Sequence, residues 1–494
     1  MTGQKFRNAE GGLIDRAKPL NFTFDGKTYQ GFQGDTLASA LLANGVRVVG
    51  RSFKYHRPRG VLGAGFEEPN ALVQLGVGAR TEPNMQATRI ELFDGLTAAS
   101  QNRWPSLNFD IGAINGLFHR LLPPGFYYKT FMAPAKLWMT YEKVIRRAAG
   151  MGRAPTQTDP DVYARRYAHC DVLVVGGGPA GLSAALAAGR SGARVILAED
   201  KPTLGGQALE SLDNVTVLTR TMAAAYYDHN LLILSERVAE HKPAPAPFEP
   251  RQRLWQVRAQ QVVLATGALE RPLVFTNNDR PGVMLASAAQ RYANEFAVRA
   301  GNRAVIFTNN DSAYDAAHDL MASGIDVAAI IDARPVIPDA VRNRVAGTEV
   351  LAGHAIVTVA AGRRGAARGV TVKAIHPQTG APTGWPRDFA CDLVAMSGGW
   401  NPTIHLFSQS KGKIKYDADI AAFTPDQSVQ QERSAGAANG TFNMAACIAE
   451  GGDAGAAAAR DAGFDAPAAG HKTDPEHRQP TQSLWIAPTG GKRF

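Results

Sequence analysis

The sequence predicts an α/β protein with an α+β N-terminal part, and three observations support this fold class. An apolar run, a glycine-rich turn and an alanine-rich stretch follow one another at 171–190, in the order strand, turn, helix. The order strand, helix, strand returns at 303–332. Before both, two alternating segments are joined by Asp25-Gly26 and followed by a helical stretch. We therefore expect a small N-terminal domain followed by two nucleotide-binding-type lobes.

The N-terminal part begins with a hairpin at 20–32, and Gly34-Asp35-Thr36 precedes a helix that ends at Gly45. Further strands are expected at 72–98. This order is typical of a β-grasp, ferredoxin-like domain, which we place at 1–99. A ferredoxin would carry cysteines in the loop after the helix, but 61–73 has none, so we expect a domain that has lost its iron–sulfur cluster. Residues 1–18 are polar and are expected to form an arm.

Two segments behind the helix admit more than one interpretation. The loop 51–60 (RSFKYHRPRG) holds four Arg or Lys residues and two aromatic residues. It is either a solvated basic loop or a docking loop for a partner subunit or a bound anion. Residues 100–168 are rich in aromatic residues and proline and predict a helical connector, whose aromatics serve either as core or as a subunit interface.

The turn after the strand at 171–175 has the spacing G-x-G-x-x-G, formed by Gly176, Gly178 and Gly181. The first glycine allows a tight turn, the second lets a pyrophosphate approach the backbone, and the third lets helix and strand pack closely. The following helix begins at Pro179 and Ala180, and its N-terminus favours phosphate charge. Glu199 ends the next apolar run, where a carboxylate can accept both hydroxyls of an adenosine ribose. An acid at this position argues against a 2′-phosphate.

The rest of the first lobe follows the same plan. The loop 205–207 (Gly-Gly-Gln) is expected to approach the phosphates, and 214–218 is a third strand. The link between them is too short for a full crossover helix. Antiparallel strands are expected over 231–262, and the buried strand that follows ends in a turn at Thr266 and Gly267.

The second lobe is expected at about 270–395. In the unit at 303–332 the glycines are replaced by residues 308–312 (TNNDS), so we predict a phosphate loop that has decayed. Residues 435–459 form a loop and a small-residue helix that can pack over the first lobe. Both lobes together are assigned to 169–460, and 461–494 is expected to be a tail or linker.

Composition excludes several classes of protein. The chain has 494 residues, a formal net charge of +9 and three widely separated cysteines, Cys170, Cys391 and Cys447. No disulfide framework, zinc site or iron–sulfur cluster held by this chain is expected, and thus no metal site. The polar N-terminus and the lack of a long apolar run predict a cytoplasmic protein without a membrane span. Basic runs typical of nucleic-acid binding are missing.

Taken together, the motifs resemble a known family. They are RSFKYHRPRG, VVGGGPAGLSAA, LATGALERPLVF, SGGWNPTIHLFSQS and GAANGTFNMAACIAEG, in that order. The chain resembles the N-terminal half of the alpha subunit of heterotetrameric sarcosine oxidase, and more distantly the alpha-type subunits of N-methylglutamate dehydrogenase and opine oxidase. The fold implied is a β-grasp domain followed by a two-lobe Rossmann-type domain like that of the disulfide reductases.

The resemblance implies a function that the residues alone do not. It implies a complex that oxidatively demethylates a secondary N-methyl amino acid, with sarcosine as the leading substrate, giving glycine, formaldehyde or methylene-tetrahydrofolate, and hydrogen peroxide. NAD is implied in this chain, FMN at the interface with a beta subunit, and FAD within beta. Amine oxidation is implied in the partner, so no catalytic residue is placed here. Smaller subunits and a separate folate-binding chain are further implied partners.

The family's NAD contacts fall on Ala180, Glu199, Asp200, Lys201 and Gln207, with looser alignment at Ala223 and 440–442. With the residues of the glycine loop and the turn after the buried strand, the candidate cofactor-binding residues are Gly176, Gly178, Pro179, Ala180, Gly181, Glu199, Asp200, Lys201, Gly206, Gln207, Ala223, Thr266, Gly267, Gly440, Thr441 and Phe442.

Two departures from the family leave alternatives open. The sequence ends where a folate-binding, aminomethyltransferase-like domain would begin, so we expect another chain to carry the folate step, or the chain to be a fragment. The aspartate that holds a flavin ribityl chain is missing near 438–440, which fits NAD better than FAD. A stand-alone FAD- and NADH-dependent reductase and a purely structural scaffold are the competing hypotheses. The amine, the final electron acceptor and the stoichiometry stay open.

Overall fold

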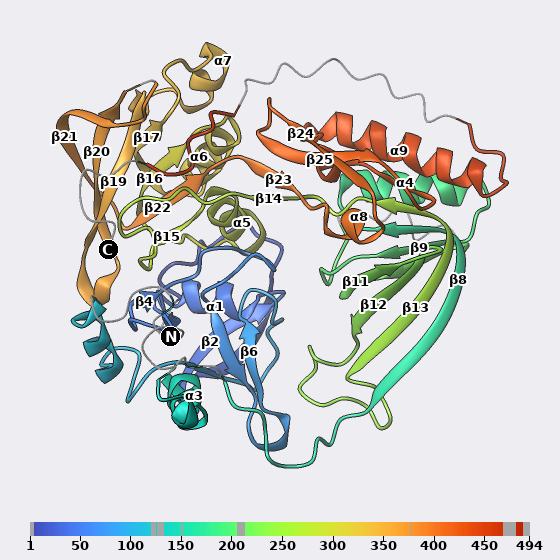
Figure 1. Ribbon diagram of the computed structural model, residues 1–494, viewed down its shortest axis with the longest axis horizontal. Helices are drawn as coiled ribbons and strands as arrows, with labels where there is room; N and C mark the ends of the chain where they lie inside the picture. Colours follow the sequence, from blue (N-terminus) through green and yellow to red (C-terminus); the bar gives the residue numbers. More distant parts are fainter. Residues whose placement is uncertain are drawn as a thin grey trace. The chain divides into compact units, whose positions relative to one another are not determined.

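The structure is a computed structural model that describes residues 4–119, 125, 133–148, 150, 152–204, 213–376, 378–467 and 481–487. The chain forms two compact units (Figure 1). Unit 1 consists of Met1–Pro160, Pro272–Gly398 and Gln482–Phe494, and unit 2 of Asp161–Arg271 and Gly399–Thr481.

The N-terminal part of unit 1 is a five-stranded sheet with the order β2-β1-β7-β5-β6. Its strands are β1 (Asp15–Phe24), β2 (Lys27–Gln33), β5 (Leu72–Leu75), β6 (Glu82–Gln86) and β7 (Leu96–Ser100). β1 pairs antiparallel with β2 and parallel with β7, and helix α1 (Leu37–Ala43) follows β2. A two-stranded ribbon of β3 (Gly50–Arg51) and β4 (Pro58–Arg59) and the 3-10 helix η1 (Gly78–Arg80) complete it. This is the predicted β-grasp arrangement.

Local sequence explains these elements. Asp25 and Gly26 both take positive φ, of 50° and 73°, which a tight hairpin turn requires. Thr36 caps α1 by accepting a hydrogen bond from the backbone N–H of Ser39. The predicted N-terminal arm is wrong for the residues described, because Phe6 is buried and Arg7 forms a buried ion pair with Asp35.

The second lobe, also in unit 1, has a parallel sheet with the order β15-β22-β16-β17-β18. The strands are β15 (Val283–Leu285), β16 (Arg303–Thr308), β17 (Asp326–Asp332), β18 (Val350–Ala352) and β22 (Leu393–Ser397). Its helices are α5 (Ala286–Phe296), α6 (Ser312–Ala322) and α7 (Asp339–Arg342) with η5 (Asn343–Val345). A separate antiparallel sheet contains β19 (His354–Ala361), β20 (Ala367–Ile375) and β21 (Pro382–Ala390), with η6 (Arg363–Gly365) between the first two.

One hydrophobic core joins this lobe to the N-terminal sheet. Phe22 and Leu41 from the β-grasp part belong to the same buried cluster as Phe307 and Ile330 from the second lobe. Sequence analysis grouped the second lobe with the first, over 169–460. Shared apolar burial instead places it in one compact unit with the N-terminal domain.

Unit 2 is built on a sheet with the order β10-β9-β8-β13-β12-β11, and β26 pairs with β13. Its strands are β8 (Tyr163–Val175), β9 (Val195–Ala198), β10 (Val215–Leu218), β11 (Thr221–Tyr227), β12 (Leu231–Arg237), β13 (Gln252–Leu264) and β26 (Glu432–Ser434). The neighbours from β10 to β13 run parallel, as does β26, whereas β11 and β12 are antiparallel. β8 begins six residues before the predicted start of this lobe at 169.

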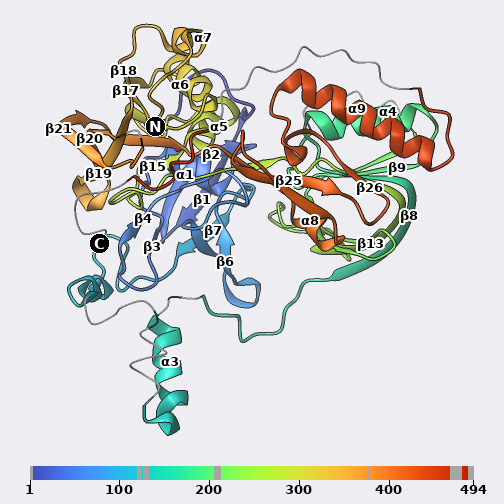
Figure 2. The same ribbon diagram turned by 45° about the horizontal axis from the view of Figure 1, so that its top comes forward.

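Two helices lie side by side on this sheet, α4 (Pro179–Arg190) and α9 (Met444–Asp461) (Figure 1, Figure 2). The contact is close because α9 carries glycine where it meets α4: a Cβ on Gly451 or Gly455 would lie 2.1 Å from the carbonyl oxygen of Ala180 or Ala184. The predicted packing of the small-residue helix over the first lobe is thus confirmed. The remaining elements of unit 2 are β14 (Ala268–Glu270), β23 (Trp400–Pro402), α8 (His405–Gln409), β24 (Lys413–Asp417), β25 (Ala422–Gln427) and η7 (Gly436–Asn439).

The connector contains η2 (Ile111–Gly116), η4 (Ala135–Leu137) and α3 (Trp138–Ala148). At the described end of the predicted tail, residues 482–487 belong to unit 1: Ile486 bridges Val274, and Ala487 is buried. Within the described residues, no helix has the length and apolar character needed to cross a membrane.

Candidate nucleotide-binding site

The glycine loop follows β8, and two of its glycines are required by close backbone approaches. Gly176 has a φ of 104°, and a Cβ there would lie 2.2 Å from the carbonyl oxygen of Ala265. A Cβ on Gly181 would lie 1.8 Å from the carbonyl oxygen of Gly176. Both distances are far inside van der Waals contact, so any side chain would force the β8 end, the β13 end and α4 apart.

Gly178 has a different environment. A Cβ built there meets no described atom within 4 Å, and its φ of −73° suits any residue. It is the N-cap of α4, Pro179 takes the first helical position, and both are exposed. Among the described residues, therefore, nothing covers the space beside the start of α4, at the positive end of the helix dipole, and such a position suits a phosphate group.

Glu199 lies directly after β9, beside the glycine loop. One carboxylate oxygen accepts a hydrogen bond from the backbone N–H of Gly177, and the other accepts one from the backbone N–H of Lys201 at 2.9 Å. A carboxylate has about four acceptor positions, so capacity for ribose hydroxyls remains. Asp200 is held differently, because Arg237 donates to its carbonyl oxygen at 2.5 Å and lies 3.4 Å from its carboxylate.

The turn after β13 is fixed by the loop that follows β23. The Thr266 hydroxyl donates to the carbonyl oxygen of Thr403 at 2.7 Å, and the Thr403 N–H donates to Gly267 at 2.9 Å. Gly267 has a φ of 72°, so the turn requires the left-handed region there. Thr266 and Gly267 therefore lie at the carboxyl end of the strand next to β8.

The loop before α9 approaches the start of α4. A Cβ on Gly436 would lie 2.7 Å from the Cβ of Ala180. Gly440, which follows η7 and caps it, has a φ of 87°, and the ring of Phe442 lies 6.5 Å from that of Trp400. The structure thus brings the glycine loop, Ala180 and the loop containing Gly440 and Thr441 to one edge of the sheet.

Three predicted residues are not joined to this group by the described contacts. Ala223 lies on β11, whose first residue, Thr221, donates from its N–H to the carbonyl oxygen of Glu199 at 2.7 Å, but Ala223 itself lies two residues further on. Gly206 and Gln207 fall outside the described residues.

Sequence reasoning missed Glu450 on α9. One of its carboxylate oxygens accepts a hydrogen bond from the Gly436 N–H at 3.0 Å, and the other accepts one from the Asn439 side chain. Glu450 therefore sets the course of the loop that meets Ala180. The available signal was an acid that interrupts the apolar and small residues of the helix.

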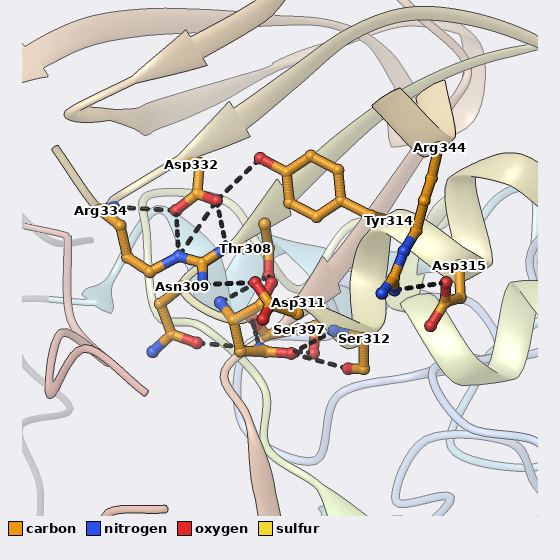
Figure 3. A network of polar contacts seen from close by, with 11 residues as sticks. Thr308, Asn309, Asp311, Ser312, Tyr314, Asp315, Asp332, Arg334, Arg344 and Ser397 are labelled. Carbon is orange, nitrogen blue, oxygen red and sulfur yellow. Dashed lines mark hydrogen bonds and ion pairs between the residues drawn. The ribbon is translucent and has the colours of Figure 1, made fainter. Parts of the chain in front are cut away.

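The equivalent place in the second lobe is occupied by the lobe's own side chains (Figure 3). Asp332 ends β17, as Glu199 follows β9, but its side chain is fully buried. Arg334 donates to this carboxylate at 2.8 Å and to Asp311 at 2.6 Å, and the Tyr314 hydroxyl donates to Asp332 at 2.9 Å. Both carboxylate oxygens of Asp332 thus accept hydrogen bonds from Arg334 or Tyr314 inside the protein. The buried carboxylate is therefore not available to a ribose hydroxyl in this conformation.

The electrostatics of this network follow from burial. Burial by itself lowers the pKa of Arg334, but hydrogen bonds and attraction from Asp332 and Asp311 outweigh it and leave the pKa raised. Burial, together with the charge of Asp332, raises the pKa of Tyr314. The arginine is therefore a permanent cation that neutralises the buried acid.

The loop at 308–312 is closed by further contacts. The Asn310 side chain donates to the Ser397 hydroxyl at 3.0 Å, and the Asn309 side chain donates to the carbonyl oxygen of Gln482 at 2.7 Å. The described tail segment thus lies against the carboxyl end of β16. In place of a glycine-rich phosphate loop, this turn therefore holds the polar side chains of Asn309 and Asn310 and is contacted by the segment at Gln482.

The three cysteines are buried, and none of them forms a disulfide with another. Burial raises the pKa of Cys170 and of Cys391 to about 12, so neither is a thiolate at neutral pH. The Cys447 thiol donates to the carbonyl oxygen of Thr441 at 3.1 Å. Among the described residues, no group of three or more His, Cys, Asp or Glu side chains could hold a metal ion.

Two protein families match separate parts of the chain. Residues 17–103 match the 2Fe-2S iron-sulfur cluster binding domain, and 171–256 match the FAD dependent oxidoreductase family. The first match confirms the ferredoxin-like fold, but 17–103 contains no cysteine. Thiolates are the ligands of such a cluster, so these residues do not fit one.

Relatives cover nearly the whole chain. It is 49% identical over 485 residues to the sarcosine oxidase alpha subunit of Rhizobium meliloti (strain 1021), a match that covers 94% of this chain and 48% of that protein. The protein of the same name from Corynebacterium sp. (strain P-1) is 38% identical over 501 residues, covering 96% and 47%. An opine oxidase subunit of Agrobacterium tumefaciens (strain Ach5) is 33% identical over 141 residues, covering 24% and 28%.

Among solved structures, L-proline dehydrogenase from P. horikoshii has a similar fold, with a TM-score of 0.60 at 19% identity, covering 93% of this chain and 77% of that one. The α/β fold class with its two-lobe Rossmann-type domain is thereby confirmed. The chain spans about half the length of the curated relatives it matches most fully. Over the part of those relatives that it spans, the chain is similar to the alpha subunits of sarcosine oxidase, the family that its motifs resemble.

Proposed function

We propose that this chain is the NAD-binding alpha-type subunit of a multi-subunit flavoprotein that oxidatively demethylates a secondary N-methyl amino acid, with sarcosine as the leading substrate. The observation that carries the proposal is the 49% identity to a sarcosine oxidase alpha subunit over 94% of the chain. The products proposed are glycine, formaldehyde or methylene-tetrahydrofolate, and hydrogen peroxide.

The described residues of the first lobe fit a dinucleotide. The open space beside Gly178 and the exposed start of α4 suit a pyrophosphate, and Glu199 suits the adenosine ribose. Gly176 and Gly181 hold this loop in its shape, and Asp200 and Lys201 follow the ribose-binding acid. NAD rather than FAD is favoured by Ala438, which is buried, and Asn439, which bonds to Glu450, where a ribityl-binding acid would stand.

The flavins are proposed elsewhere in the complex: FAD in a beta-type subunit, where the amine would be oxidised, and FMN at the boundary of the two subunits. The support is the family relationship alone. When bound, these flavins would supply the redox chemistry, and no residue of this chain is assigned a proton-transfer or redox step. The role proposed for its first lobe is to bind and orient a nucleotide.

A stand-alone FAD- and NADH-dependent reductase is the second candidate, and one observation favours it: residues 171–256 match the FAD dependent oxidoreductase family. The closed second lobe opposes it, because such a reductase needs a second nucleotide site or a reactive thiol, and two of the three cysteines, Cys170 and Cys391, have pKa values raised by burial to about 12. An opine or N-methylglutamate dehydrogenase complex remains within the same proposal, because it changes the amine and not the role of this chain.

The test is to purify the complex from its native source and identify its cofactors by mass spectrometry and absorbance. NAD, FAD and FMN together with a beta-type chain, and flavin bleaching on adding sarcosine, are expected. Stoichiometric FAD on the lone chain would overturn the proposal in favour of the reductase.

A substitution at Glu199 tests whether the nucleotide binds to the first lobe. Glu199→Gln removes the charge that accepts ribose hydroxyls, and hydrogen bonds to a charged group contribute about 1.5–3 kcal/mol, so NAD affinity should fall by roughly tenfold or more. Glu349→Gln, which alters an exposed acid paired with Arg387, is the matched control and should bind NAD as the unaltered chain does. Equal NAD binding by both variants, measured by calorimetry, would exclude Glu199 from the site.

A further inference from the structure

We infer that the surface around η2 is the docking site for a second protein chain whose matching face is apolar with a rim of carboxylates. This inference rests on the proposed function, because it identifies where a partner subunit would bind. We call this surface the docking platform, and it consists of Phe53, Trp104, Phe109, Ile111, Ile114 and Leu117.

The platform owes its shape to the geometry of a 3-10 helix. With three residues per turn, side chains three apart in sequence lie in one row. Ile111, Ile114 and Leu117 form such a row and are 45%, 53% and 78% exposed. Gly112 and Asn115 form the next row and face the basic loop instead: a Cβ on Gly112 would lie 2.3 Å from the His56 ring, and Asn115 donates to the carbonyl oxygen of Lys54 at 3.5 Å. One face of η2 is anchored and the other, which is apolar, is exposed.

A buried polar cluster holds the segment in place. His56 Nδ1 lies 2.7 Å from the Asp110 carboxylate, and both side chains are buried. Asp110 also accepts hydrogen bonds from the N–H groups of Trp104 and Gly112, at 2.9 and 3.1 Å, so it closes the turn and caps η2. Arg51 donates to the carbonyl oxygens of Leu107 and His56. The platform is therefore preorganised, which lowers the ordering cost of binding.

For Trp104 and Phe109, this anchoring decides between the two interpretations of the connector's aromatic residues. Trp104 and Phe109 are 66% and 69% exposed although their backbone is tied down. Residues that served as core would be covered by the fold that anchors them. Fixed, clustered and exposed large apolar side chains mark an interaction surface.

The positive charge around the platform indicates which kind of partner surface would bind there. The platform borders the basic loop, in which two guanidinium groups, of Arg57 and Arg59, share the single carboxylate of Asp279, and Lys54 lies over the Tyr55 ring, so the loop keeps a net positive charge. The sequence 101–160 holds eight Lys or Arg residues and three Asp or Glu residues, and the whole chain has a net charge of +9. A second copy of this chain would meet like charge, whereas a partner with a carboxylate rim would be attracted.

The experiment measures binding of the flavin-containing subunit that copurifies with the unaltered chain from the native source. Ile114→Glu and Leu117→Glu place a carboxylate in the exposed row without touching the anchored one. The dissociation constant should rise by at least about tenfold for each variant, as for a buried interface residue. Val336→Glu is the matched control, because Val336 is 70% exposed in the same compact unit and lies outside the platform. The melting temperature and NAD binding of the isolated chains should not change.

A second readout identifies the contacted surface. A photo-reactive phenylalanine analogue introduced at Leu117 should cross-link to the flavin-containing subunit in a peptide rich in Asp and Glu. Raising the salt concentration should weaken binding of the unaltered chain.

The outcomes separate the two proposals. If the unaltered chain binds its flavin-containing partner and both glutamate variants bind it equally well, the platform is wrong while the proposed function stands. If no flavin-containing partner copurifies, both fall. Loss of self-association in the variants, or binding of the unaltered chain to vesicles of anionic phospholipid that the variants lose, would overturn the inference in favour of a second copy or a membrane surface.

Discussion

Glycine serves three separate purposes within six residues of the loop after β8. Gly176 takes a positive φ, Gly181 allows a backbone approach, and Gly178 leaves a space open. The first two requirements concern folding, and the third fits the nucleotide that we propose for this lobe. Sequence reasoning assigned these roles from spacing, and the dihedral of Gly176 and the contact at Gly181 agree with it.

These roles predict opposite effects for two substitutions of the same kind. Gly181→Ala places a Cβ 1.8 Å from the carbonyl oxygen of Gly176 and should lower the free energy of unfolding by at least about 1–3 kcal/mol, as overpacking does. Gly178→Ala meets no described atom within 4 Å and should change stability by less than about 1 kcal/mol. It should nevertheless weaken NAD binding by roughly tenfold or more, because its methyl group takes the space proposed for phosphate.

Urea unfolding and calorimetric NAD titration measure both effects. Each variant is the control for the other, since the same methyl group is added to the same loop. Full NAD affinity in Gly178→Ala would show that the phosphates lie elsewhere.

At the scale of elements, the basic loop between β3 and β4 is joined to the loop before β15 by one carboxylate. Arg57 donates to Asp279 at 2.7 Å, and Arg59 donates to its other oxygen and to its carbonyl. Burial alone raises the pKa of Asp279, but the charges and hydrogen bonds of Arg59 and Arg57 lower it more, so the pKa lies below its ordinary value.

This shift predicts a pH dependence of stability. A carboxyl whose pKa is depressed on folding stabilises the protein above its unfolded pKa, near about 3.9, and loses this contribution as the pH falls through the folded value. Asp279→Asn should therefore lower the free energy of unfolding at pH 7 by about 1–3 kcal/mol, and the difference from the unaltered chain should shrink below about pH 4.

Urea unfolding at pH 7, 5 and 3 tests this expectation. Asp315→Asn is the control, because Asp315 pairs with Arg344 at the surface and such pairs contribute about 0–1 kcal/mol. A constant difference between Asp279→Asn and the unaltered chain at all three pH values would contradict the mechanism.

Short sequence patterns were enough to predict the positions of most helices and strands. The Asp25-Gly26 turn, the Thr36 cap and the period-2 strands were readable because their causes lie within a few residues. η2 was not distinguished within the connector, because a six-residue 3-10 helix has little periodicity and depends on Asp110 and His56 for its position.

At the scale of the molecule, the chain passes between its two compact units four times, at 160, 271, 398 and 481. Each unit has buried clusters of its own, and the nucleotide proposed here binds residues of unit 2. Binding to one unit stabilises that unit by mass action.

Thermal unfolding should therefore show two transitions, of which NAD raises one. At a concentration about one hundred times its dissociation constant, NAD should stabilise unit 2 by about 2.7 kcal/mol. Hydrogen exchange followed by mass spectrometry should show the added protection in peptides of 161–271 and 399–467 and little in 283–376. A single transition that shifts as a whole would show that the units do not unfold separately.

Amino-acid sequence alone was enough to predict the fold class, the first lobe's glycine loop with its acid, the loss of the cluster cysteines and the similarity to sarcosine oxidase alpha subunits. These features depend on short patterns whose physical causes are local, such as a turn that only glycine can make. Tertiary packing determines whether residues at similar positions in the pattern are exposed or buried. Glu199 follows one parallel strand and Asp332 ends another, but only Asp332 is buried, where it meets Arg334 two residues further on and Tyr314, which the packing of α6 places beside it. The exposed row on η2 was equally undetermined, since whether an isoleucine is core or surface depends on what the folded chain places over it.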